Sequence, residues 1–306
     1  MQCTMPEHFA DTLIARVREL GHPLCAGIDP HLPMIPPLFR RASMAAADPA
    51  TADAVEAFVL AGLERIAPYV AVVKPQSAFF ELLGWRGVQA LEQVVEQARL
   101  AGCQVILDAK RGDIGTTAAA YAGCLDDSAP MQVDALTISP YLGRDTLAPF
   151  FAAVGAHGRG VFVLAKTSNP GSADLQDRLI DGVPLYAHVA AGLADAATQL
   201  RGPVTGWSSL GIVAGATHPA EHERLRAALP DALFLVPGYG AQGACAADAV
   251  RAFVAGPRGR EGGIVSSSRA LLFPPDANTD DLHTWERAID AAVQRAVDEL
   301  GSAVAA

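Results

Sequence analysis

The sequence predicts an α/β protein, a (β/α)₈ TIM barrel that forms a single domain over residues 1–306. Two observations lead to this prediction. Short apolar runs alternate with alanine-rich amphipathic stretches along the chain, and eight such units can be counted. Strands that alternate with helices form a parallel sheet, and eight repeats in one chain are typical of a closed barrel. A doubly wound open sheet is the structural alternative.

The apolar runs are the expected strands, and the amphipathic stretches between them are the expected helices. We expect strands at 24–29, 69–74, 103–108, 133–139, 160–167, 208–213, 233–237 and 263–266. We expect helices at 51–66, 88–100, 144–154, 185–200, 219–229 and 244–254, and a closing helix at 280–300. The proline- and alanine-rich stretch 31–49 is predicted to be a long loop, and 257–262 a flexible one.

The composition limits the possible partners. A chain of 306 residues that is 51% hydrophobic can bury a large core. The formal net charge of −10 argues against a nucleic acid or an anionic membrane as partner. The five cysteines are scattered, no signal-peptide pattern is present, and no stretch approaches the roughly 18 apolar residues of a membrane span. We therefore expect a cytoplasmic protein.

The densest group of charges follows the third expected strand. The run Val105-Ile-Leu107 is apolar enough to be buried on both faces, and it continues directly into Asp108 and Lys110. If the chain stays extended, these two side chains point to the same side. Asp113 follows in a turn that contains glycine. Partly buried charges must be paired, so this spacing favours an active site over a solvated loop.

Polar and charged residues also follow the other expected strands. Asp29 ends the first strand and Lys74 the second, while the polar stretches 166–171, 237–242 and 266–269 follow the fifth, seventh and eighth. Functional side chains of a (β/α)₈ barrel lie at the carboxyl ends of its strands. We therefore expect these residues to share one rim of the barrel.

A glycine-rich stretch follows the seventh expected strand. Gly238-Tyr-Gly-Ala-Gln-Gly243 matches GxGxxG, which holds a pyrophosphate in dinucleotide-binding folds, but no ribose-binding acid follows it here. In a barrel, the loops after strands seven and eight commonly hold a phosphate through backbone N–H groups. Arg269 offers a planar, bidentate partner for the phosphate oxygens. We predict a phosphate site at this position.

A second pattern, His218 and His222, has the spacing of a zinc-binding pair on a helix. The neighbouring Pro219, Glu221 and Glu223 suit the exposed first turn of a helix, and no third ligand is evident. We therefore predict no metal site.

The run Asp108-Ala-Lys-Arg-Gly-Asp-Ile-Gly-Thr-Thr117 resembles the orotidine 5′-phosphate decarboxylase family, in the form found in its bacterial type 2 branch. The run Val72-Val-Lys-Pro-Gln-Ser-Ala-Phe-Phe-Glu81 is similar to the same branch. The resemblance covers roughly residues 24–272. Related decarboxylases and aldol-type synthases that act on sugar phosphates share Asp-x-Lys-x-x-Asp, so this motif alone leaves the substrate open.

The resemblance implies a role for each matching residue. It places Asp108, Lys110 and Asp113 around the scissile carboxylate as catalytic residues. It implies that substrate is bound by Asp29 and Lys74 at the ribose, Ile114 and Thr117 from a neighbouring subunit, Ser168 (or Thr167) at the pyrimidine edge, and Gln242 and Arg269 at the phosphate.

The activity that the resemblance implies is the conversion of orotidine 5′-monophosphate to UMP and CO₂, in de novo pyrimidine synthesis, without a cofactor. Lys110 would stabilise and protonate the carbanion at C6, and the protein would be a homodimer with shared active sites. Two alternatives remain. One is a sugar-phosphate lyase of the same superfamily whose acids bind Mg²⁺, and the other is a catalytically silent nucleotide-binding protein.

Overall fold

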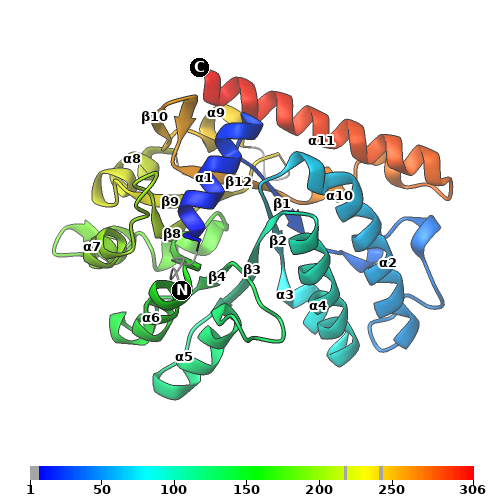
Figure 1. Ribbon diagram of the computed structural model, residues 1–306, viewed down its shortest axis with the longest axis horizontal. Coiled ribbons are helices and arrows are strands. Elements are labelled where there is room, and N and C mark those ends of the chain that lie inside the picture. Colours follow the sequence, from blue (N-terminus) through cyan, green and yellow to red (C-terminus); the bar gives the residue numbers. More distant parts are fainter. Residues whose placement is uncertain (1–6, 217–218, 241–243) are drawn as a thin grey trace, which may run out of the picture.

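Eight parallel strands form a closed barrel with helices around it (Figure 1). The computed structural model describes residues 7–216, 219–240 and 244–306. The first strand, β1, pairs with both β2 and β12, so the sheet has no free edge in the barrel. This confirms the predicted fold and excludes the open sheet. In spatial order the strands are β1 (Leu24–Ile28), β12 (Gly263–Ser267), β9 (Ala232–Pro237), β8 (Ser208–Ala214), β5 (Gly160–Lys166), β4 (Ala135–Ile138), β3 (Gln104–Arg111) and β2 (Val72–Pro75).

The helices lie outside the barrel, and α11 runs along one side of the molecule to the C-terminus (Figure 1). Each predicted helix is present, although one is shorter than expected. The α-helices are α1 (Phe9–Leu20), α2 (Pro49–Ile66), α3 (Ser77–Glu81), α4 (Gly84–Leu100), α5 (Gly115–Ala122), α6 (Ala148–His157), α7 (Leu185–Gln199), α8 (Pro219–Ala228), α9 (Ala246–Ala249), α10 (Arg269–Leu272) and α11 (Leu282–Ala305). The long loop 31–49 contains two short 3₁₀ turns, η1 (Leu32–Met34) and η2 (Pro37–Phe39).

Two small hairpins interrupt the alternation of strands and helices. One consists of β6 (Leu179–Ile180) and β7 (Val183–Pro184), and the other of β10 (Val254–Gly256) and β11 (Gly259–Glu261). The second hairpin shows that the prediction of a flexible loop at 257–262 was wrong. The Glu261 side chain fixes this hairpin, because it accepts hydrogen bonds from Arg18 at 2.7 Å and from Trp207 Nε1 at 3.0 Å.

The barrel interior is a separate apolar cluster, closed at one end by α1. Alternate strand residues point inward, among them Val72, Ile106 and Ala135, and they pack with the buried face of α1. Phe9 of α1 meets Phe162 of β5 edge to face, with ring centroids 6.0 Å apart. Helix α1 was not predicted, because residues 9–20 precede the first strand and lie outside the repeating pattern.

No helix in the described ranges combines the length and apolar character that a membrane crossing requires. The four cysteines in these ranges, Cys25, Cys103, Cys124 and Cys245, are free thiols.

Replacing Phe9 with alanine tests whether α1 contributes to the stability of the barrel. Phe9 is almost fully buried, so the variant is expected to lower the free energy of unfolding by about 3–4 kcal/mol. Leu100→Ala is the matched control, because Leu100 is 73% exposed, and its effect is expected to stay below about 0.5 kcal/mol. Urea denaturation measures both. Equal effects of the two substitutions would contradict a stabilising role for α1.

Candidate active site

Three polar side chains continue the inward-facing rows of the barrel at its carboxyl end. Lys74 stands two residues after inward-facing Val72, and Asp108 two residues after Ile106. Thr137 follows Ala135 in the same way on β4. All three side chains are buried. Because alternate residues of a strand point inward, the same row of side chains is apolar inside the barrel and polar at its rim.

Asp108 joins two lysines. Its Oδ2 accepts a hydrogen bond from Lys74 Nζ at 2.7 Å, and its Oδ1 accepts one from Lys110 Nζ at 2.6 Å. Thr137 Oγ1 donates a third bond to Oδ1, at 3.0 Å. The side chain of Lys74 is 7% exposed, whereas that of Lys110 is 46% exposed. Lys110 therefore offers the cluster's accessible ammonium group.

The pKa values of the buried pair follow from burial and from these charges. Burial alone would raise the pKa of Asp108, but the positive charges of Lys74 and Lys110 and their hydrogen bonds outweigh it and lower that pKa. Burial alone would lower the pKa of Lys74, but the charges of Asp108 and Asp29 outweigh it and raise that pKa. Both groups are therefore charged at neutral pH.

The backbone at Lys110 is not extended, so the condition of an extended chain after Leu107 is not met, although Asp108 and Lys110 do lie together as expected. Leu107 of β3 pairs with Leu136 of β4, but the next pair is Arg111 with Ile138. Residues 108–110 thus form a bulge opposite a single residue, and Lys110 has a φ of 48°. The side chains of Asp108 and Lys110 meet within this bulge.

Asp29 directly follows β1 at the same rim. Its Oδ1 is buried and has no hydrogen-bond partner among the described residues. Asp29 is close enough to Lys74 for its charge to raise the pKa of that lysine. A buried carboxylate oxygen without a donor is costly, so this atom is suited to accept a hydrogen bond from a ligand.

A cavity of about 320 Å³ opens beside the charged cluster. Lys74, Asp108 and Lys110 form one part of its wall, and Thr167 and Ser168, which follow β5, form another. The remaining lining includes Leu164, Val213, Leu235 and Pro237. The cavity therefore offers charges on one side and apolar surface on the other.

Five of the predicted site residues that the structure describes do not line this cavity: Asp29 and Arg269 at the rim, and the group of Asp113, Ile114 and Thr117. Asp113 Oδ1 accepts a hydrogen bond at 2.7 Å from the N–H of Ile114, the residue that precedes α5. The side chain of Ile114 is 63% exposed, and Thr117 is exposed on the first turns of α5. None of the three lines the cavity.

The predicted phosphate end is described in part. Arg269 is exposed at the start of α10 and has no carboxylate partner among the residues that the structure describes. Gln242 and the end of the glycine-rich stretch lie outside the described residues. Gly238 and Gly240 have φ values of 103° and 74°, a backbone conformation that favours glycine.

The predicted absence of a zinc pair concerns a region that is also described in part. His218 lies outside the described residues, and the buried His222 ring faces the carbonyl oxygen of Gly215 at 3.0 Å. Within the described ranges, no three His, Cys, Asp or Glu side chains gather as metal ligands would.

Two buried polar residues near the cavity had no role assigned from the sequence: Thr137, which was not singled out, and Lys166, which was expected only as the first residue of the polar stretch 166–171 at the rim. Thr137 was visible as a polar residue within an apolar strand, two positions after Ala135. Lys166, at the end of β5, is fully buried, and its Nζ lies 2.6 Å from Asp177 Oδ1 and 3.3 Å from Ser172 Oγ. This pairing holds the segment that follows Ser168 against the barrel.

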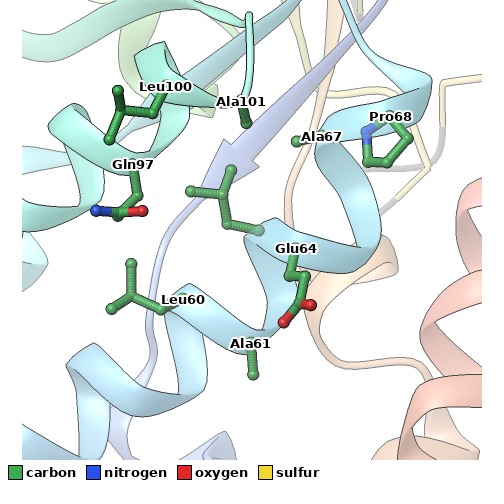
Figure 2. Close-up of a pocket in the computed structure, with 9 residues that line it drawn as sticks. Leu60, Ala61, Glu64, Ala67, Pro68, Gln97, Leu100 and Ala101 are labelled. Atoms are coloured by element: carbon green, nitrogen blue, oxygen red, sulfur yellow. The ribbon is translucent and has the colours of Figure 1, made fainter.

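A larger cavity, about 830 Å³, lies between α2 and α4. Figure 2 shows that its labelled lining is mostly apolar, with Leu60 and Glu64 on α2 and Gln97 and Leu100 on α4. None of the charged residues at the strand ends lines this cavity. We therefore place the candidate active site in the smaller, charged cavity.

A charged cavity at the carboxyl ends of a closed parallel barrel defines the class of protein, a (β/α)₈-barrel enzyme. Comparisons with known proteins identify the family. The family described as "Orotidine 5'-phosphate decarboxylase / HUMPS family" matches residues 23–278. The chain therefore belongs to this family, and it is an enzyme of the decarboxylase type.

Individual relatives match this chain over most of its length. An orotidine 5′-phosphate decarboxylase of Rhodopirellula baltica is 40% identical over 301 residues, which cover 95% of this chain and 98% of the relative. That of Salinispora tropica is 47% identical over 244 residues, 79% of this chain and 82% of the relative. A crystal structure described as an orotidine 5′-phosphate decarboxylase of Streptomyces avermitilis has a TM-score of 0.80 at 37% identity. The match covers 100% of this chain and 99% of the chain in that structure. The OMP decarboxylase of Leishmania donovani has a TM-score of 0.73 at 33% identity, with coverage of 99% and 100%.

Asp108→Asn tests the pKa direction at the centre of the site. A carboxylate whose pKa is lowered by folding stabilises the protein above its unfolded pKa of about 3.9, and this contribution is lost as the pH falls toward the folded pKa. Between about pH 5 and pH 3 the free energy of unfolding of the wild type is therefore expected to fall by about 1 kcal/mol more than that of Asp108→Asn. Urea denaturation at both pH values measures the difference. Parallel pH dependences would contradict the lowered pKa.

Proposed function

We propose that this protein converts orotidine 5′-monophosphate to UMP and CO₂, without a cofactor, as a step of pyrimidine nucleotide synthesis. The observation that carries the proposal is the position of Lys110: its ammonium group is accessible, sits beside the cavity and is held by the buried carboxylate of Asp108. Membership of the decarboxylase family supports the choice of substrate.

The cavity suits a flat pyrimidine with charge at one edge. In the proposed complex the apolar lining, which includes Val213 and Leu235, contacts the faces of the base. Ser168, or its neighbour Thr167, forms a hydrogen bond with the edge of the pyrimidine. The carboxylate at C6 then points toward the cluster of Lys110 and Asp108.

Lys110 carries the chemistry of the proposed reaction. The bond between C6 and the carboxylate carbon breaks, CO₂ leaves, and the electron pair stays on C6. The ammonium group of Lys110 stabilises this carbanion and then transfers a proton from Nζ to C6, which completes UMP; solvent returns the proton to the neutral amine. Asp108 fixes the ammonium in place, because a charge held before the reaction needs no reorganisation when the carbanion forms.

The ribose and phosphate bind at the rim on either side of this centre. Asp29 has a buried oxygen to which no residue of the described ranges donates, which suits a ribose hydroxyl, and Lys74 lies beside it. Arg269, without a carboxylate partner in the described ranges, binds the phosphate together with Gln242. Binding energy from this remote phosphate helps to order the loops around the base.

The proposed functional unit is a homodimer with shared sites. Asp113, Ile114 and Thr117 lie outside the cavity of their own chain. Large apolar side chains are exposed in the neighbouring loop after β4 as well, where Tyr141 is 77% exposed and Leu142 is 49% exposed. In a twofold dimer these residues of one subunit complete the site of the other.

A turnover assay with orotidine monophosphate tests the metal-dependent alternative. Loss of orotidine monophosphate absorbance is followed before and after exhaustive dialysis against EDTA. Unchanged turnover supports the proposal, and recovery only on addition of Mg²⁺ would support a sugar-phosphate type of chemistry. Tight UMP binding without turnover would instead favour the catalytically silent alternative.

Two alanine variants are expected to separate chemistry from binding. Lys110→Ala removes the proton donor, so kcat should fall by at least about 1,000-fold while UMP still binds. Arg269→Ala removes a charge-assisted contact to the phosphate, so KM should rise by about 10- to 100-fold with a smaller change in kcat. Steady-state kinetics and calorimetric titration with UMP measure these effects. Near-normal kcat in Lys110→Ala would remove the central claim.

Mixing two inactive variants tests the shared site. If Asp113 acts in the partner's site, a heterodimer of Lys110→Ala and Asp113→Ala has one doubly altered site and one intact site. Activity should then return to roughly a quarter of the wild-type value per total subunit, because random exchange makes half of the dimers mixed. Each variant alone is the control. An inactive mixture, with subunit exchange confirmed by mass spectrometry, would contradict shared sites.

A further inference from the structure

The side chain of Thr137 forms hydrogen bonds both with the backbone of Lys110 and with Asp108, the charged partner of Lys110. Thr137 lies on β4, is 1% exposed, and lines the candidate cavity. Its Oγ1 accepts hydrogen bonds from the N–H groups of Ala109 at 3.0 Å and Lys110 at 2.9 Å. The same hydroxyl donates to Asp108 Oδ1 at 3.0 Å.

These three contacts use the full hydrogen-bonding capacity of a hydroxyl group. A threonine Oγ1 has one proton to donate and two lone pairs to accept with. Since two N–H groups occupy the acceptor positions, the proton is directed to the carboxylate of Asp108. The hydroxyl therefore has a defined orientation and links backbone and side chain of the same bulge.

The link lies at the bulge in the pairing of β3 and β4. Residues 108–110 lie opposite Thr137 alone, because the pairing of β3 and β4 passes from Leu107 with Leu136 directly to Arg111 with Ile138. Lys110 has a φ of 48° in the bulge, a left-handed conformation that is unfavourable for a residue other than glycine. A hydrogen bond to the N–H of the same residue offsets part of this cost.

We propose that Thr137 is a positioning residue for Lys110, an inference that rests on the decarboxylase function proposed above. Its hydroxyl fixes Lys110 at both ends. It holds the backbone N–H directly, and it holds the ammonium through Asp108 Oδ1, which Lys110 Nζ approaches to 2.6 Å. Without the hydroxyl the bulge relaxes, and Nζ moves away from the position where C6 of the substrate develops charge.

A purely structural role makes a different prediction. If Thr137 only satisfied buried polar groups, its loss would lower stability but leave the catalytic step of the folded enzyme unchanged. Thr137→Val is the appropriate variant, because it has nearly the same shape and lacks the hydroxyl. Thr137→Ser is the matched control, because it keeps the hydroxyl and lacks the methyl group.

The kinetic test compares these variants with the wild type. Since a displacement of about 1 Å can reduce a rate by about 100-fold, kcat of Thr137→Val is expected to fall by about 10- to 100-fold, with Kd for UMP changed by less than about threefold. Thr137→Ser is expected to keep kcat within about threefold of the wild type. If Thr137→Val keeps its kcat, or if both variants lose kcat equally, the hydroxyl does not position Lys110. Should the valine variant fail to fold, Thr137→Ala against Thr137→Ser makes the same comparison.

A crystal structure of Thr137→Val separates this inference from the proposed function. It is expected to show that Lys110 leaves the left-handed region and that the contact between Lys110 Nζ and Asp108 Oδ1 is lost. Unchanged geometry would overturn the inference even if the wild type decarboxylates orotidine monophosphate. Absence of wild-type turnover would instead overturn the proposed function, and the geometry of the variant would still decide the role of Thr137.

Discussion

The arrangement of the active-site end depends on one buried carboxylate held between two lysines. Asp108 stands where the apolar interior of the barrel ends, so burial favours its neutral form. Lys74 and Lys110, each within 2.7 Å of one of its oxygens, reverse that preference. The three charges are mutually dependent, because loss of one ammonium leaves a buried charge that is insufficiently compensated. This dependence keeps the accessible Lys110 in a fixed position.

The barrel separates two chemical environments along its axis. Toward α1 the interior is apolar and closely packed, with Phe9 against Phe162. Toward the other end the same inward-facing rows continue as Lys74, Asp108 and Thr137. No additional domain is needed to build the site, because a change of residue type two positions along each strand is sufficient.

The strands and the Asp108 cluster could be predicted from sequence because they depend on local patterns. Eight apolar runs fixed the strand count, and charges at their ends indicated the rim. The bulge at Lys110 could not be predicted, because it forms against Thr137 of β4, which lies 27 residues further along the chain. The hairpin of β10 and β11 was missed for a similar reason, since the contacts of Glu261 with Arg18 and Trp207 become visible only in three dimensions. The expected roles of Asp113, Ile114 and Thr117 concern a second subunit, on which the pattern within one chain gives no information.

The position of α1 also has a consequence for how the chain folds. This helix is synthesised early, yet its partners come late: Arg18 binds Glu261, which is 243 residues away, and Phe9 packs on Phe162. Contacts of such long range form slowly, because much of the chain must be ordered before they become possible. During synthesis the apolar face of α1 has no barrel to cover, so a nascent chain that stops before β12 exposes a surface prone to aggregation. The apolar face of α1, which closes one end of the folded barrel, is thus the surface that a chaperone would need to protect longest.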